Sequence, residues 1–144
     1  MKPKNTQKTA LVIGCVVILM LIAGCSHSVE ASSTVAEDVT AREAYELIEA
    51  NQGGEAFVIL DVRTPGEFAE GHIEGAINID YRGTSFRDRI DDLARDYRSL
   101  IYCRSGNRSQ GALTVMSELG FHEIYHLAGG IIEWSEAGLP LTRR

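Results

Sequence analysis

The sequence SLIYCRSGNRSQGALTVMSEL, residues 99–119, decides how this chain folds. Its first four residues form an apolar run with a β-branched and an aromatic side chain, which predicts a short buried strand at 99–102. From 109 to 119 the apolar side chains recur at helical spacing and share one face, which predicts a helix. Gly120 and Phe121 then supply the residues of a Schellman cap. Cys103 therefore lies between a strand end and a helix start.

Main-chain N–H groups are expected to gather around Cys103. The first turn of a helix leaves N–H groups without partners, and a tight loop ahead of it aims more of them inward. Because these donors and the helix dipole stabilise an anion, the thiol is expected to have a pKa below its usual value of roughly 8.5. Arg104 and Arg108 add positive charge, and Gly106 gives the turn its backbone freedom.

The alternative is that Cys103 is a small buried core residue, as most free cysteines are. Two arginines in the same loop argue against this interpretation, since a guanidinium is almost never buried unpaired. The local sequence alone therefore leaves both interpretations open, a core cysteine and a nucleophilic thiolate in an anion-binding loop.

Strands and helices alternate along the rest of the chain. Thr40 with Glu43, and Thr64 with Glu67, form capping boxes that begin two helices, the second with Pro65 at its first position. Further strands are predicted at 57–60, 77–79 and 124–127, and further helices at 41–48, 85–93 and 131–134. This alternation predicts an α/β fold with helices on both faces of a parallel sheet. In such sheets, binding sites form at the carboxyl ends of strands, where Cys103 is placed.

Two segments upstream carry a family resemblance. Residues 61–68, DVRTPGEF, and 71–79, GHIEGAINI, resemble the signature segments of the rhodanese-like (sulfurtransferase) domain. The Cys103 loop is similar to the active-site loop of that family, and Gly129-Gly130 with Trp134 is similar to its closing segment. The resemblance runs from about Thr34 to Pro140. It implies a central, mainly parallel five-stranded sheet with helices on both faces, in a domain spanning 35–144.

The resemblance also implies a chemistry. Cys103 is the expected catalytic nucleophile, which takes a sulfane sulfur from a donor such as thiosulfate as a persulfide and passes it to a thiol, cyanide or a thioredoxin-like protein. The expected substrate-binding residues are Arg104, Ser105, Gly106, Asn107, Arg108 and Ser109, with Arg104 facing the anionic donor. No metal or organic cofactor is implied.

Other polar and aromatic residues are given structural roles. Asp61 and Arg63 follow a buried strand, and we expect a structural pair that braces the Cys103 loop; a catalytic acid and a substrate clamp are the alternative. The resemblance makes His72 a structural residue hydrogen-bonded to the backbone. His126 alternates with apolar residues and is interpreted as strand filler, and Trp134 as a core residue.

Two other classes of function stay open. Cysteine phosphatases and some arsenate reductases have a similar loop with one more residue, whereas here four residues separate Cys103 from Arg108. The smaller loop suits a single sulfur atom better than a tetrahedral oxyanion. The second alternative is a non-catalytic or redox-sensing binding module, against which the presence of Cys103 argues.

The N-terminal segment predicts export. Lys2, Lys4 and Lys8 precede an apolar run at 10–23, which is typical of a signal peptide at 1–24. Leu21-Ile22-Ala23-Gly24-Cys25 resembles a bacterial lipobox, which implies cleavage before Cys25 and lipidation of that cysteine. An uncleaved membrane anchor is the alternative. Residues 25–34 are predicted to be a linker, and the domain is predicted to be an extracytoplasmic, membrane-anchored lipoprotein of the periplasm or cell envelope.

Composition limits the partners of the mature chain. All three lysines precede Cys25, so the chain from that residue onward has eleven arginines, twenty acids and a net charge of −9. This charge argues against a nucleic-acid surface. With Cys25 acylated, Cys103 is the single free thiol, which excludes an intramolecular disulfide and a cysteine zinc site. We expect a monomer.

Overall fold

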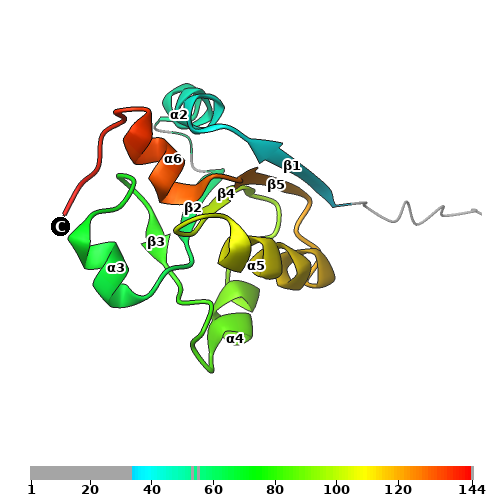
Figure 1. Ribbon diagram of the computed structural model, residues 1–144. Helices are drawn as coiled ribbons and strands as arrows, with labels where there is room; N and C mark the ends of the chain where they lie inside the picture. Colours follow the sequence, from blue (N-terminus) through cyan, green and yellow to red (C-terminus); the bar gives the residue numbers. More distant parts are fainter. Residues whose placement is uncertain (1–33, 53, 55, 144) are drawn as a thin grey trace, which may run out of the picture. The chain divides into compact units, whose positions relative to one another are not determined.

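A computed structural model describes residues 34–52, 54 and 56–143. Five strands form one sheet in the order β1-β5-β4-β2-β3, and every neighbouring pair is parallel (Figure 1). The strands are β1 (Val35–Val39), β2 (Phe57–Asp61), β3 (Ile77–Asn78), β4 (Arg98–Tyr102) and β5 (Glu123–Leu127). The helices are α2 (Ala41–Ala50), α3 (Pro65–Glu70), α4 (Phe86–Asp91), α5 (Asn107–Glu118) and α6 (Gly130–Glu136). The predicted α/β class is confirmed, with a sheet that is wholly parallel.

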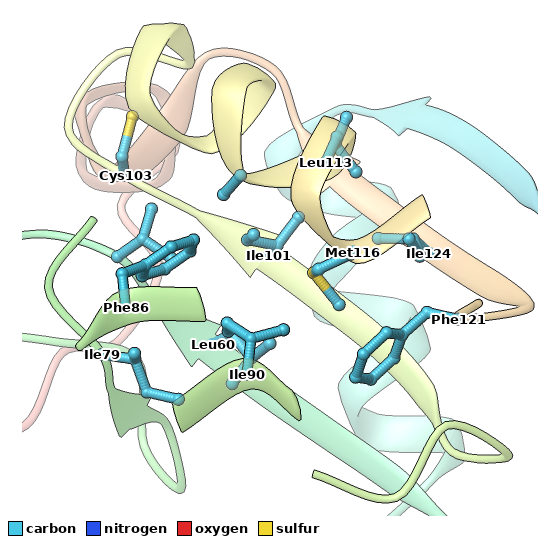
Figure 2. Close-up of a cluster of buried hydrophobic side chains, with 12 residues drawn as sticks. Leu60, Ile79, Phe86, Ile90, Ile101, Cys103, Leu113, Met116, Phe121 and Ile124 are labelled. Atoms are coloured by element: carbon cyan, nitrogen blue, oxygen red, sulfur yellow. The ribbon is translucent and has the colours of Figure 1, made fainter. Parts of the chain in front are cut away.

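Each face of the sheet carries its own apolar cluster. One cluster joins sheet residues to α4 and α5, and its large side chains include Leu60, Phe86, Ile90, Ile101, Met116 and Phe121 (Figure 2). The other joins the opposite face to α2 and α6, and includes Ile59, Leu100, Tyr102, Leu127, Ile131 and Trp134. Successive residues of β4 alternate between the clusters, as the pleat requires. The central strands are therefore covered on both sides, which explains their continuous apolar runs.

The predicted helix ends are present in the structure. Both capping boxes form, at Thr40 for α2 and at Thr64 for α3. At the end of α5, Gly120 adopts a φ of 82°, and the N–H of Phe121 donates to Met116 O in the Schellman pattern. α5 therefore begins at the end of the Cys103 loop and ends at this cap.

Residue patterning did not identify β1. Its sequence, VAEDV, holds two acids, and only Val39 is buried. The strand pairs on one side only, with β5, and so lies at the edge of the sheet. An edge strand exposed to water needs no continuous apolar run, which is why its sequence resembles that of a loop.

The expectations for the N-terminus fall outside the described residues. They concern the signal peptide at 1–24, the lipidation of Cys25 and most of the linker at 25–34. Thr34, the last residue of that linker, is described, and its hydroxyl donates to Phe121 O at 2.7 Å. Within the described part of the chain, every helix is too short or too polar to cross a membrane.

Candidate active site

The Cys103 loop follows β4 at the carboxyl edge of the sheet and ends where α5 begins. Cys103 is only 1% exposed, at the margin of the first apolar cluster. Figure 2 shows its sulfur pointing away from the other side chains of that cluster. Gly106 is the N-cap of α5 and has a φ of 89°, in the left-handed region that favours glycine. The turn therefore brings the start of α5 over the sulfur, as the sequence predicted.

Hydrogen-bond donors surround the Cys103 sulfur. Burial acts to raise the pKa of the thiol, but the Ser109 hydroxyl and the backbone N–H groups of Ser109, Ser105 and Arg108 outweigh it and hold the pKa below its ordinary value. Ser109 Oγ lies 3.4 Å from Cys103 Sγ. Each donor stabilises the thiolate more than the thiol, so the loop favours the charged form of a buried sulfur.

The carbonyl groups of the loop are held by α6. The N–H of Ile131 donates to Cys103 O at 2.9 Å, and the N–H of Ile132 donates to Arg104 O at 3.2 Å. These donors belong to the first turn of α6 and would otherwise lack partners. A Cβ on Gly130 would lie 2.5 Å from the Arg104 carbonyl, so only glycine allows this approach. With its carbonyls engaged outward, the loop can aim its N–H groups at the sulfur.

Arg108 lies between the sulfur and a carboxylate. Its Nη1 and Nη2 each donate to Glu67 of α3 at 2.7 Å. The hydrogen bonds from Arg108 are the main cause that lowers the pKa of Glu67 to about 2. Glu67 also raises the pKa of Arg108, as do the charge of Cys103 and a hydrogen bond to it. The positive charge that Arg108 was expected to add to the loop is therefore paired with the Glu67 carboxylate.

Arg104, Ser105 and Asn107 have exposed side chains. Ser105 contributes its main-chain N–H to the sulfur, and Asn107 is the first residue of α5. The Arg104 carbonyl accepts a hydrogen bond from α6, and the Arg104 side chain is exposed at the surface. The loop therefore has a main-chain interior and a cationic exterior.

Asp61 and Arg63 form a buried ion pair at the end of β2, with Arg63 Nη2 at 2.6 Å from Asp61 Oδ2. Arg63 also donates to Gly71 O at 2.7 Å and lies over the Tyr102 ring, 5.7 Å from its centroid. The Tyr102 hydroxyl accepts from the N–H of Ile73. The pair therefore connects segment 71–73 to the residue before Cys103, so it braces the strand end next to the loop.

Two of the structural assignments are confirmed. The His72 ring stacks on Phe68, and its Nδ1 lies 2.9 Å from Phe68 O. Trp134 is buried in the second apolar cluster and donates to Pro140 O.

The assignment of His126 as strand filler is wrong. Its ring is buried, with Nε2 at 2.9 Å from Ser109 Oγ and Nδ1 at 2.7 Å from Asp38 Oδ1. Asp38 of β1 pairs with His126 in the sheet register. A polar side chain inside a buried parallel strand needs a partner, and this requirement was the available signal in the sequence.

A metal site needs several ligating side chains close together. Within the described residues, no group of three or more His, Cys, Asp or Glu side chains is placed to hold a metal ion.

Comparison with known proteins identifies the family. The family model described as Rhodanese-like domain matches residues 40–137. A sulfurtransferase of Allochromatium vinosum is 36% identical over 88 residues, covering 61% of this chain and 80% of that protein. Thiosulfate sulfurtransferase 16, chloroplastic, of Arabidopsis thaliana is 36% identical over 118 residues, covering 75% of this chain and 94% of that protein. The crystal structure of a rhodanese-related protein from Thermoplasma volcanium superposes with a TM-score of 0.64 at 33% identity, covering 75% of this chain and 99% of that one.

The chain belongs to the rhodanese-like domain family. Its relatives named as sulfurtransferases support this enzyme class for the chain. The family resemblance read from residues 61–79 and the Cys103 loop is thereby confirmed.

Gly106→Ala tests the loop geometry. A Cβ at this position would lie 2.2 Å from Ala128 O, and the backbone would be strained at its positive φ. The loop must shift, so the N–H groups leave the sulfur and the pKa of Cys103 rises. We expect alkylation by iodoacetamide at neutral pH to slow by about tenfold. Gly66→Ala, where a Cβ meets nothing within 4 Å, is the control, and an unchanged rate in Gly106→Ala would contradict this geometry.

Glu67→Gln tests the Arg108 ion pair. Because the pKa of Glu67 is about 2 in the fold and ordinarily 4.5, its stabilisation is complete above pH 4.5 and is lost as the pH falls toward 2. Glutamine keeps one oxygen for the cap of α3, so the variant removes the charge and one of the two acceptors of Arg108. We expect the free energy of unfolding, measured in urea, to fall by about 1 kcal/mol at neutral pH. The variant should also lose less stability than the native protein as the pH is lowered. Glu46→Gln, on the exposed side of α2, should keep the full acid dependence; equal behaviour of the two variants would refute the assignment.

Proposed function

We propose that this protein transfers a sulfane sulfur from a donor such as thiosulfate to a thiophilic acceptor through a Cys103 persulfide. The observation that carries the proposal is the set of donors around a single buried sulfur, formed by the Ser109 hydroxyl and the N–H groups of Ser105, Arg108 and Ser109. This set suits an anion centred on sulfur, either the thiolate or the terminal atom of a persulfide.

The reaction proceeds in two displacements. The Cys103 thiolate attacks the outer sulfur of thiosulfate, a new S–S bond forms, and sulfite leaves with the electron pair of the broken S–S bond. The N–H groups then stabilise the terminal sulfur of the persulfide. A thiolate or cyanide acceptor attacks that sulfur, and the Cys103 thiolate returns. Because sulfur enters and leaves at the same atom, the kinetics are expected to be ping-pong.

The size of the loop supports sulfur transfer over phosphate or arsenate chemistry. Four residues separate Cys103 from Arg108, and Glu67 binds both terminal nitrogens of the Arg108 guanidinium. An arginine committed to a carboxylate is poorly placed to clamp a tetrahedral oxyanion as a bidentate donor. A protein partner that binds without sulfur transfer stays as the alternative outcome of the test below.

We also propose that the domain acts outside the cytoplasm as a monomer tethered through lipidated Cys25. The basic start of the chain, the apolar run at 10–23 and the lipobox-like residues before Cys25 support the tether. The acidic mature chain argues against an electrostatic attachment to anionic lipid. A thioredoxin-like protein with an exposed thiolate is a suitable acceptor in that compartment.

Intact-protein mass spectrometry tests both proposals on the protein isolated from membranes. Exposure to thiosulfate should add the mass of one sulfur atom, and cyanide should remove it. Cys103→Ser should show no gain, while cleavage and acylation should appear as their own mass changes in both proteins. No sulfur gain and no turnover with any sulfane donor would favour the binding module instead.

Arg104→Gln tests the role of the exposed guanidinium. A charge-assisted contact with the anionic donor should be lost, so we expect KM for thiosulfate to rise about tenfold while kcat changes little. The measurement is steady-state transfer from thiosulfate to cyanide. Arg42→Gln, an exposed arginine of α2, is the matched control. An unchanged KM in Arg104→Gln would remove Arg104 from the donor site.

A further inference from the structure

A row of polar groups leads from the active-site sulfur to the surface, and the two-displacement mechanism uses only its first members. Cys103 Sγ lies 3.4 Å from Ser109 Oγ, which lies 2.9 Å from His126 Nε2, and His126 Nδ1 lies 2.7 Å from Asp38 Oδ1. The His126 side chain is 4% exposed and that of Asp38 is 70% exposed. The row therefore links a buried thiol to a hydrated carboxylate.

The protons along this row of hydrogen bonds can be placed in two ways, which differ in the charge of His126. Asp38 as a carboxylate accepts only, so His126 Nδ1 carries a proton. If His126 is neutral, Nε2 accepts the Ser109 hydroxyl proton, and Ser109 cannot donate to Cys103. If His126 is an imidazolium, Nε2–H donates to Ser109, whose own proton is free to reach the sulfur. Gly106 O, at 2.9 Å from Ser109 Oγ, is the competing acceptor.

We propose that His126, oriented by Asp38, is a positioning residue that takes up the proton of Cys103 through Ser109 and holds it as an imidazolium facing the thiolate. The inference rests on the proposed function only in treating Cys103 as the nucleophile. Ser109 acts as the bridge, because its hydroxyl both donates and accepts.

The proton step balances within the row. The S–H bond of Cys103 breaks and its proton passes to Ser109 Oγ, while the Ser109 hydroxyl proton passes to His126 Nε2. A neutral thiol and a neutral imidazole become a thiolate and an imidazolium, with no change in net charge. The imidazolium lies between two acceptors, and the thiolate gains the Ser109 hydrogen bond, so both products are stabilised.

The groups that face His126 come from three elements of the fold. β1 contributes the Asp38 carboxylate, and α5 contributes the Ser109 hydroxyl. β4 presents Ile101 beside His126, and the adjoining cluster is apolar. Cys103 is the titratable group that faces the ring through Ser109. An apolar surround strengthens the attraction between imidazolium and thiolate.

The test follows Cys103 alkylation by iodoacetamide across the pH range, with no sulfur donor present. Under the proposed proton transfer, the alkylation rate of the native protein should show two steps in its pH profile. His126→Gln should give one step, and a rate near pH 6 that is slower by about tenfold. Asp38→Asn keeps an oxygen for Nδ1–H but loses the charge. Its alkylation rate near pH 6 should also be slower than that of the native protein, by less than in His126→Gln. His122→Gln, a partly exposed histidine next to β5, is the control and should match the native profile.

The double variant of Asp38 and His126 tests whether Asp38 acts through the His126 ring or only supports the fold. Adding Asp38→Asn to His126→Gln should change nothing further, because Asp38 acts through the ring. A one-step native profile, a His126→Gln profile equal to the native one, or a persistent Asp38→Asn effect in the double variant would each overturn the proposal. If His126→Gln does not fold, an unshifted Asp38→Asn profile overturns it. Loss of sulfur transfer with an intact two-step profile would refute the proposed function and leave the relay standing.

Discussion

The site depends on two hydrogen bonds that join the first turn of α6 to the Cys103 loop. The N–H groups of Ile131 and Ile132 donate to Cys103 O and Arg104 O. One contact thereby satisfies two requirements: α6 finds acceptors for its unpaired donors, and the loop is held with its carbonyl groups outward. Gly130 makes the approach sterically feasible, and Gly106 completes the turn. The N–H groups that remain can then face the sulfur.

Main-chain groups and Ser109, more than free arginines, set the charge of the sulfur. Burial opposes ionisation of Cys103, and the hydrogen bonds must exceed that effect for the thiolate to form. Arg108 contributes, but Glu67 shares its charge and ties α3 to the loop. The same arrangement explains why signature segment 61–68 includes the start of α3, since Glu67 caps that helix and also pairs with the loop. Asp61 and Arg63 fix the neighbouring strand end, where Arg63 lies over the ring of Tyr102, the residue before Cys103.

Local signals predicted much of this from sequence. The capping boxes, the Schellman glycine and the apolar runs depend on neighbouring residues, so the five described helices and four of the five described strands were predicted, with Cys103 at the right edge of the sheet. Three features depend on tertiary pairing and were missed. β1 is exposed and acidic, Glu67 finds Arg108 across 41 positions, and His126 meets Asp38 across 88 positions. An isolated polar residue in an apolar strand signals a buried partner, but the sequence does not say which one.

The site depends most on the loop donors that hold the pKa of Cys103 below its ordinary value. The most direct measurement is a pH titration of the native protein carrying 13C at the cysteine Cβ, observed by NMR, since the Cβ shift reports thiol and thiolate separately. We predict that the main Cys103 transition lies below the usual cysteine pKa of roughly 8.5. A transition at or above that value would show that burial prevails over the loop donors, and would contradict the account.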